Sequence, residues 1–206
     1  MMKKFKIFVD INEEEKYLNS MANKGYILKN LSIFGRYHFS EEKPQDLHYK
    51  IDYRDFKNKN DFDDYIALFE DAGWKHVCGT KSSGNQYFLP QTDESDNDIF
   101  SDIESKAGRY LRFRKVMMSC LICFALCIVA IMASVNFNLS ELGFLTPGLW
   151  DMHGEEFWNA FLFELPFVFM RICPVIIISI LTVIYATFAV KAKKLYEKAI
   201  YEKDNL

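Results

Sequence analysis

Lysine and arginine are absent from a long interior part of the chain. Residues 136–170 contain neither. The charged side chains of this part are all acidic: Glu141, Asp151, Glu155, Glu156 and Glu164. Loops on the cytoplasmic side of a membrane are enriched in Lys and Arg, so a connection without them is typical of the opposite side. The absence therefore predicts that this part of the chain faces away from the cytoplasm.

Motifs of common catalytic sites are also missing. The sequence has no glycine-rich phosphate loop, no GxSxG and no Walker motif. No pair of its histidines, His38, His48, His76 and His153, has the spacing of a metal site. We therefore expect no catalytic residue, no metal and no cofactor, and we predict a protein that is not an enzyme.

Cysteines are few, and none lies in the body of the acidic connection. The sequence thus gives no sign of an extracytoplasmic disulfide framework. Cys120 and Cys123 form a CxxC pair, and Cys127 follows on the same helix face. A thiol or metal site in the membrane is one interpretation. We favour small apolar packing residues, because no histidine or acid lies nearby in sequence.

The first hundred residues are acidic, with 14 Lys and Arg against 18 Asp and Glu. Such a balance does not favour contact with nucleic-acid phosphates, so we expect no direct nucleic-acid binding. The N-terminal ten residues alternate without an apolar core run, so no secretion signal is expected.

Two apolar stretches predict membrane-spanning helices. Residues 116–135 have no charge and no proline, and residues 172–190 also have no charge. A helix of about 20 residues covers roughly 30 Å, the hydrocarbon thickness of a bilayer. Pro166 and Pro174 are expected in the first turns of the second helix, where proline is best tolerated.

Basic residues flank these stretches on their outer sides. We assign them, with Arg171 near the far end of the second span, to membrane anchoring: Arg109, Arg112, Arg114 and Lys115 before the first span, and Lys191, Lys193 and Lys194 after the second. The positive-inside rule then places both termini on the cytoplasmic side of a bacterial cytoplasmic membrane. Glu164 and Arg171, seven residues apart, are expected to pair at the outer interface, as a helix-end anchor rather than a sensor of membrane-active compounds.

The remaining periodicity predicts seven segments: a cytoplasmic α+β domain (1–90), an acidic linker (91–98), an amphipathic juxtamembrane helix (99–115), transmembrane helix 1 (116–136), an extracytoplasmic loop with an interfacial helix (137–165), transmembrane helix 2 (166–190) and a cytoplasmic tail (191–206). Within the domain, strands are expected at 3–10, 26–31, 34–40, 47–53, 74–80 and 86–89. Helices are expected after Asp10 or Asn12 and at 60–72.

A short pattern occurs twice in the domain. Tyr17-Leu18-x-x-Met21-x-x-x-Gly25-Tyr26 returns 48 residues later as Tyr65-Ile66-x-x-Phe69-x-x-x-Gly73-Trp74. The pattern predicts a β-α-β-β unit used twice, forming one antiparallel sheet with two helices on one face. The alternative is that any helix leading into a strand ends in this way. A two-helix transmembrane hairpin completes the expected fold.

The polar face of this sheet is a candidate surface for docking a partner. If strand alternation holds, it presents six residues on one side: Arg36, His38, His48, Lys50, Asp52 and Arg54. An ordinary solvated sheet face would have the same pattern.

Four blocks resemble the DUF2812 family: EEKYLNSMANKGYIL at 14–28, YKIDYRD at 49–55, FEDAGWKHVC at 69–78 and IFSDIESKAGRYLR at 99–112. The resemblance implies a bacterial protein of unknown function with an N-terminal domain followed by membrane spans. It also implies a protein partner, a PadR-type regulator or a transporter component. The family offers no established catalytic residue to transfer.

We therefore predict a membrane-anchored regulatory or sensory protein whose cytoplasmic domain binds a protein partner. Alternatives are an accessory subunit of a membrane transporter and a membrane-bound enzyme of unknown reaction. Association of the chain with another copy of itself is also open.

Overall fold

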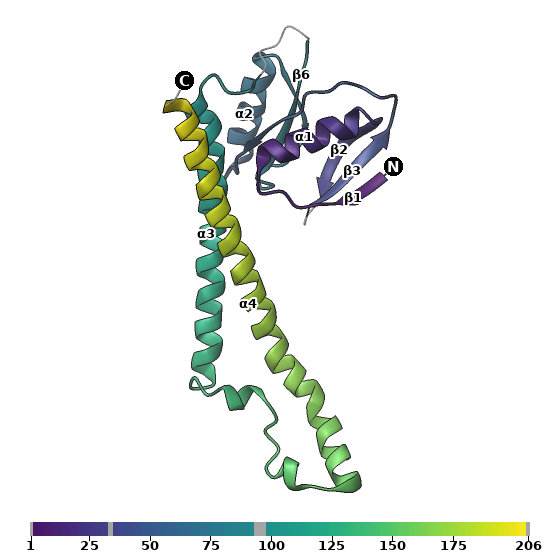
Figure 1. Cartoon of the computed structure of the whole chain (residues 1–206), viewed down its shortest axis with the longest axis vertical. Coiled ribbons are helices and arrows are strands. Elements are labelled where there is room, and N and C mark those ends of the chain that lie inside the picture. The colour runs from purple at the N-terminus through teal and green to yellow at the C-terminus, as the bar shows by residue number, and fades with distance from the viewer. Residues whose placement is uncertain (1, 33–34, 93–97, 205–206) are drawn as a thin grey trace. The chain divides into compact units, whose positions relative to one another are not determined.

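A computed structural model describes residues 2–32, 35–92 and 98–204 (Figure 1). The chain forms two compact units. Unit 1 comprises residues 1–115 and 189–206, and unit 2 comprises residues 116–188. The predicted linker falls partly on residues 93–97, and Phe34 of a predicted strand falls on 33–34, so these positions lie outside the described residues.

Unit 1 contains the same order of elements twice. Its first half consists of β1 (Met2–Phe5), α1 (Ile11–Ala22), β2 (Tyr26–Ser32) and β3 (Arg36–Glu41). Its second half consists of β4 (Lys50–Tyr53), α2 (Lys59–Asp71), β5 (Trp74–Cys78) and β6 (Asn85–Pro90). The predicted β-α-β-β order is therefore present in both halves.

The strands form two antiparallel sheets, not the single sheet that we predicted. Their orders are β1-β3-β2 and β4-β6-β5, so the last strand of each half lies in the middle of its own sheet. Each half can close its own sheet because its strand after the helix continues directly into a hairpin. The two halves therefore match in strand order as well as in sequence pattern.

The helices do not share one face of a sheet, contrary to the prediction. On β6, the Tyr87 hydroxyl donates to Glu14 of α1, whereas the neighbouring Phe88 ring stacks on Phe69 of α2 with centroids 4.6 Å apart. Successive residues of a strand point to opposite faces. The second sheet is therefore covered by α1 on one face and by α2 on the other.

Local signals for α1 are confirmed. The Asp10 side chain accepts from the N–H of Asn12 and caps the helix. Leu18, Met21 and Ala22 are buried along one side. Gly25 follows with φ of 82°, a left-handed conformation that glycine adopts without steric cost. Gly73 occupies the equivalent position after α2 with φ of 84°.

The helical spacing of Tyr65, Leu68, Phe69 and Ala72 predicts an apolar side of α2 that the structure shows only in part. Tyr65 is buried and Phe69 partly buried, but Leu68 is 66% exposed and Ala72 is also exposed. Tyr65 forms a core cluster with Trp74 and Phe88, and Ile66 and Phe69 pack against it. The packed stripe of α2 is therefore rotated by about one residue from the predicted one.

β1 is shorter than the predicted strand at 3–10. The alternation of that segment predicts Phe5 on the buried side and Lys4 on the exposed side, and the structure has the reverse. Met2 and Lys4 pair with Phe39 and Tyr37, the two buried residues of β3, whereas Phe5 pairs with the exposed Arg36. Directly opposite residues of a ladder share a face. Phe5 is therefore 66% exposed, and Ile7 beyond the strand is exposed as well.

Two long helices complete the chain, α3 (Ile103–Ser134) and α4 (Gly154–Asp204), with the short 3₁₀ helices η1 (Leu139–Leu142) and η2 (Leu149–Asp151) between them. Both long helices are long and apolar enough to cross a membrane. The juxtamembrane helix begins at Ile103 rather than at residue 99. The predicted interfacial helix is part of α4, so Pro166 and Pro174 lie inside this helix rather than in its first turns.

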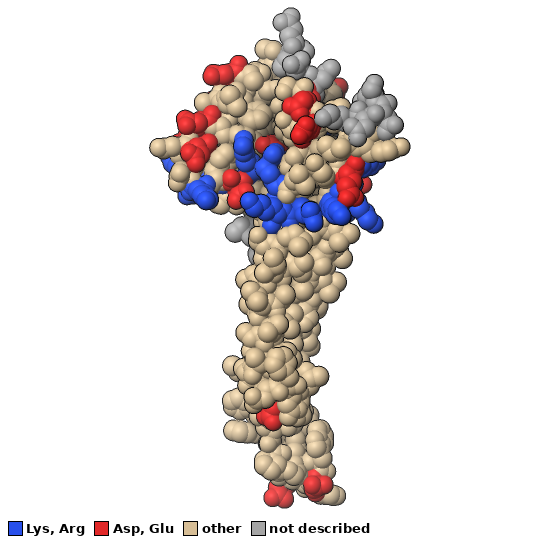
Figure 2. All heavy atoms as spheres, turned by 90° about the vertical axis from the view of Figure 1, so that its left-hand side faces the viewer, with Lys and Arg blue, Asp and Glu red and all other residues tan. Residues whose placement is uncertain are grey.

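Charge is distributed differently on the two units. Unit 2 contains a single basic residue, Arg171, beside five acidic ones, and its surface in the view shown is almost entirely uncharged (Figure 2). Lys and Arg gather on unit 1 (Figure 2). The tail of α4 belongs to unit 1, in which Ala189 and Ala192 are buried.

Candidate functional site

The edge of the second sheet at β4 is closed by side chains. Ile51 donates its N–H to Glu15 Oε1 at 3.1 Å and accepts at its carbonyl oxygen from Arg109 Nη1 at 2.8 Å. Two residues on, the Tyr53 carbonyl accepts from Arg112 Nε at 2.6 Å. An uncovered edge strand exposes unpaired backbone groups that invite pairing with other chains. Here α1 and the first turns of α3 satisfy those groups.

Arg109 is the central residue of this closure. It is 1% exposed, and its Nη1 forms an ion pair with Glu15 Oε1 at 2.8 Å. Its Nη2 donates to Asn12 Oδ1 at 2.6 Å. The guanidinium also lies over the rings of Phe100 and Tyr110, 5.7 Å and 5.4 Å from their centroids. One arginine thereby joins α3 to both α1 and β4.

Arg112, one helical turn later, bonds to a second buried acid. Its Nη2 pairs with Asp52 Oδ1 on β4. The Asp52 carboxylate also accepts from the Tyr65 hydroxyl of α2 at 3.0 Å, which connects this helix to the same point. Burial, and the Asp52 charge after it, raise the pKa of the Tyr65 hydroxyl, which therefore remains a donor.

Two further contacts hold the start of α3. The Tyr110 hydroxyl donates to Asp10 Oδ1 at 3.0 Å, so the residue that caps α1 also meets α3. Lys106 pairs with Asp98, the first described residue after the gap, and Lys50 of β4 lies 3.9 Å from the same carboxylate. We refer to Arg109, Arg112, Glu15, Asp52 and the β4 backbone as the α3 joint.

The α3 joint corrects part of the assignment to membrane anchoring. Arg109 and Arg112 bond to the domain, and Arg109 is too deeply buried to meet a lipid headgroup. The signal that misleads is their position directly before an apolar span. The other residues assigned to anchoring are exposed or partly exposed: Arg114, Lys115, Arg171, Lys191, Lys193 and Lys194. Arg171 pairs with Glu164 at 3.3 Å, which confirms the expected pair.

The six residues of the predicted docking face do not form one surface. Arg36 and His38 belong to β3 of the first sheet, and the His38 ring bonds to Ser32 Oγ at 2.8 Å. Lys50 and Asp52 belong to β4 of the second sheet, and Asp52 is buried in the α3 joint. His48 lies in the preceding loop near Asp46.

Arg54 lies with its guanidinium carbon 5.6 Å from the centroid of the Tyr65 ring. It is thus on the side of α2, in the second half. The alternation of residues 47–53 predicts one covered and one solvated face, but both faces of this sheet are covered by helices. The predicted docking face is therefore wrong.

Glu14 forms a buried acidic site that the sequence analysis missed. Its carboxylate is 2% exposed and accepts from the hydroxyls of Tyr37 and Tyr87 and from Asn85 Nδ2. Burial raises the pKa of Glu14, opposed by the bonds from Tyr37 and Tyr87. In sequence it is one of three consecutive acids at the start of a helix, a pattern usually explained by the helix dipole alone.

A groove of about 870 Å³ lies beside this site, where the hairpins of the two halves meet. Tyr87 and Asn85, which bond Glu14, belong to its lining. Phe5 and Arg36 line it from the first half, and Thr80 and Ser82 from the second. The groove therefore combines an exposed aromatic ring, a guanidinium and hydroxyl groups.

No cluster of three or more His, Cys, Asp or Glu suited to a metal is present among the residues that the structure describes. Cys78 is buried, and burial raises the pKa of its thiol to about 12, so it is not a nucleophile at neutral pH. Burial also lowers the pKa of His76, whose ring contacts Gln86 Oε1 at 3.2 Å.

The edge strand β1 of the first sheet has no cover like that of β4 among the described residues. Within the described parts of the chain, β1 pairs only with β3. The Lys6 N–H donates to the Gly35 carbonyl oxygen, so the backbone groups of Lys6 point toward β3. This direction alternates along an antiparallel strand, so the backbone groups of residues 2 and 4 also point toward β3. The backbone groups of Lys3 and Phe5 therefore point away from β3. An extended segment can add to this edge.

The comparisons with known proteins identify a family for this arrangement. The family model described as "Protein of unknown function (DUF2812)" matches residues 10–122, more than half of the chain. The match begins at the cap of α1, after β1, and runs through the rest of the domain and the α3 joint into the first apolar stretch. Neither the curated proteins nor the solved structures include a match to the chain. This chain therefore belongs to the DUF2812 family, as its four sequence blocks indicated.

Proposed function

We propose that this protein is a membrane-anchored regulatory or sensory protein, without enzymatic activity, whose soluble domain binds a protein partner. The observation that carries the proposal is the α3 joint. A single helix, α3, bonds through Arg109 and Arg112 to the edge of a sheet and continues as an apolar stretch long enough to span a bilayer.

This continuity gives a physical route for a signal. A helix resists bending and twisting over a few turns, so a shift of its apolar part is transmitted along its axis. Arg109 is buried in the joint, where an unpaired charge is costly. We therefore expect Arg109 to keep its bonds to Glu15 and β4 when α3 shifts. Displacement of α3 therefore acts on β4 and α1 rather than on a flexible linker.

The orientation of the chain follows from its charges. Unit 2 has one basic residue and the flanks in unit 1 have many, which favours a cytoplasmic location for both termini and for the domain. Both apolar helices would then cross the cytoplasmic membrane of a bacterium. Arg114, Lys115, Lys191, Lys193 and Lys194 would contact anionic headgroups on the inner side.

The open edge of β1 is the surface that best fits a partner. An extended peptide can pair with the outward groups of Lys3 and Phe5, as in recognition by strand addition. Phe5 and Ile7 offer exposed apolar contacts, and Lys3 and Arg36 favour an acidic segment. The partner is thus an extended, acidic segment of a protein, and the sequence resemblance suggests a PadR-type regulator or a transporter component.

Affinity capture from solubilised membranes tests this function. The tagged full chain should retain a protein whose recovery falls at least tenfold in Lys3→Pro, which removes one outward N–H of β1. Arg109→Gln with Arg112→Gln should change recovery at least threefold at equal membrane levels. Lys57→Glu, an exposed position outside both surfaces, is the matched control and should have no effect.

A partner retained equally by all variants would refute the proposal. Recovery of a protein with many membrane spans that depends on unit 2, and not on β1, would instead favour the accessory subunit of a transporter.

A further inference from the structure

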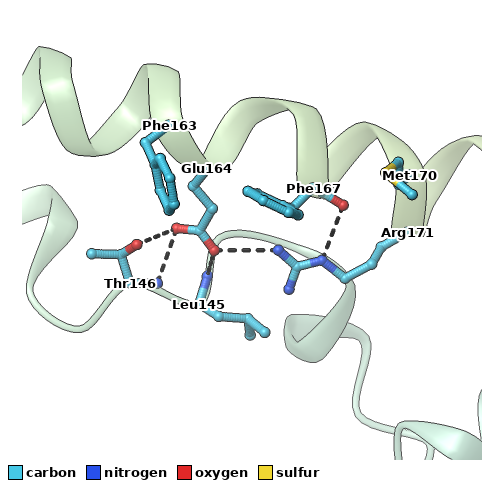
Figure 3. Close-up of a pocket in the computed structure, with 7 residues that line it drawn as sticks. All are labelled: Leu145, Thr146, Phe163, Glu164, Phe167, Met170 and Arg171. Carbon is cyan, nitrogen blue, oxygen red and sulfur yellow. Dashed lines mark hydrogen bonds and ion pairs between the residues drawn. The ribbon is translucent and has the colours of Figure 1, made fainter.

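Unit 2 contains a cavity of about 550 Å³ along α4, which is wide open at the surface of the unit (Figure 3). Leu145, Phe163, Phe167 and Met170 give it an apolar lining. Glu164 and Arg171 supply its charges and point toward one another in the close-up (Figure 3). A volume of roughly 300–1,000 Å³ with few polar groups on an apolar wall is typical of a small-ligand site.

The Glu164 carboxylate already accepts four hydrogen bonds from the protein. Its carboxylate accepts from the N–H groups of Leu145 and Thr146 and from the Thr146 hydroxyl, which holds the preceding segment against α4. It also accepts from Arg171 Nη2 at 3.3 Å. The carboxylate therefore fixes the position of the guanidinium and has little capacity left for a ligand of its own.

The Arg171 guanidinium donates two hydrogen bonds to residues of unit 2. Its Nε donates to the Phe167 carbonyl at 3.2 Å, and one Nη2 hydrogen is directed to Glu164. A guanidinium has five N–H donors in a planar fork. Within residues 116–188, all of which the structure describes, the other three have no hydrogen-bond acceptor. They are free for an anion with two or more oxygens.

The surroundings restrict what this anion can belong to. Arg171 is the only Lys or Arg of unit 2, and it is surrounded by side chains that an acyl chain can contact. An arginine in a helix tilts its side chain toward the N-terminus of the helix, here toward Glu164 and the end of the apolar stretch. With residues 172–190 as the membrane span, as proposed above, Arg171 would lie at the level of the lipid phosphate groups.

We propose that this cavity binds a lipid with an anionic phosphate headgroup, with its phosphate on Arg171 and an acyl chain against Phe163, Phe167 and Met170. Glu164 acts as a positioning residue that orients the guanidinium. The site lies outside the domain and the α3 joint, so the inference does not depend on the partner proposed above.

Native mass spectrometry of the full chain in a maltoside detergent tests this site. The probes are dioctanoyl phosphatidic acid, dioctanoylglycerol and inorganic phosphate, which separate the phosphate from the acyl chains. We expect one phosphatidic acid per chain at saturation, with dioctanoylglycerol at least tenfold weaker and no competition from millimolar phosphate. Arg171→Gln should weaken phosphatidic acid at least tenfold, Arg171→Lys less, and Lys57→Gln, the same charge change at an exposed position of the domain, not at all.

Met170→Ser provides a second variant that leaves both charges in place. It should weaken phosphatidic acid several-fold and leave any binding of inorganic phosphate unchanged. Equal binding by wild type and Arg171→Gln would overturn the proposal. Competition by inorganic phosphate at the affinity of the lipid would show a site for free anions and would overturn the assignment to a lipid.

Discussion

The two halves of the domain have the same order of elements, but their first strands differ in how their outer backbone groups are bonded. In the second half, β4 is closed by Arg109 and Arg112 of α3 and by Glu15 of α1. In the first half, β1 presents the backbone groups of Lys3 and Phe5 without a described partner strand. The first strand of each half is an edge strand, and this chain covers one of them, β4, with its long apolar helix α3.

This difference explains why the halves diverge in sequence where they agree in fold. The second half must place Asp52 on β4 to receive Arg112, and Tyr65 on α2 to support it. The first half instead supplies Glu14 and Glu15 from α1, and these carboxylates reach the second sheet. The helix of the first half therefore holds the two halves together.

The largest predicted effect concerns the closed edge. Arg109→Gln leaves Glu15 buried without its cation, which typically costs about 3–5 kcal/mol. Hydrogen exchange of the β4 peptide in the detergent-solubilised full chain should show this loss of opening free energy. Arg114→Gln, only five residues away, should change it by less than about 0.5 kcal/mol. Equal effects of the two variants would mean that proximity to the span, and not the joint, determines stability.

The next prediction tests the duplication itself. Gly25→Ala and Gly73→Ala each force a residue with a Cβ into left-handed backbone, at a cost of about 1–2 kcal/mol. At Gly25 an added Cβ would also lie 2.5 Å from the Glu42 carbonyl oxygen, which adds to the cost of the backbone conformation. Exchange rates of α1 and α2 peptides measure both. A substitution tolerated in both halves would show that the shared caps are not needed.

A smaller effect depends on pH. Burial raises the pKa of Glu14 above its ordinary value of 4.5, so the folded protein keeps this proton to higher pH than the unfolded chain. Between the two pKa values the folded state binds more protons, and stability therefore falls as the pH rises through this window. Wild type should thus lose stability relative to Glu14→Gln as the pH is raised from 4.5. The exchange of β6 at several pH values, corrected for intrinsic rates, gives this difference, and a difference that grows in the other direction would contradict the raised pKa.

The smallest predicted change in stability is at the open edge. Lys3→Pro removes an N–H that points outward, so we expect a loss below about 0.5 kcal/mol. Lys4→Pro removes an N–H directed at β3 and should cost about 1 kcal/mol or more. Exchange of β3 peptides compares them. If Lys3→Pro lowers the stability more than Lys4→Pro does, the N–H of Lys3 points toward β3, and the direction assigned to the backbone groups of β1 is wrong.

Local features of this fold were predictable because their causes lie close together in sequence. Asp10 caps a helix that begins at the next residue, and Gly25 and Gly73 end helices that precede aromatic strand openings. The two long apolar helices follow from uncharged stretches of about 20 residues. The pairing of Glu164 with Arg171 depends on helical spacing alone.

The α3 joint was not predictable in this way. Arg109 and Glu15 are 94 residues apart, and Arg112 and Asp52 are 60 apart. Beside an apolar span, an arginine resembles a lipid anchor, and on an alternating strand an aspartate resembles a solvent-facing residue. Only the covering of both faces of the second sheet by α1 and α2, and of its edge by α3, makes these residues internal.

A double-mutant cycle between Arg109 and Glu15 tests the central claim most directly. Opening free energies of β4 are measured by hydrogen exchange in wild type, Arg109→Gln, Glu15→Gln and the double variant of the full chain. If α3 is bound to the sheet edge through this ion pair, the two substitutions should be non-additive, with a coupling energy of about 1–3 kcal/mol. Additivity within about 0.5 kcal/mol would show that the arginine and the glutamate do not interact, and that α3 is not joined to the domain in this way.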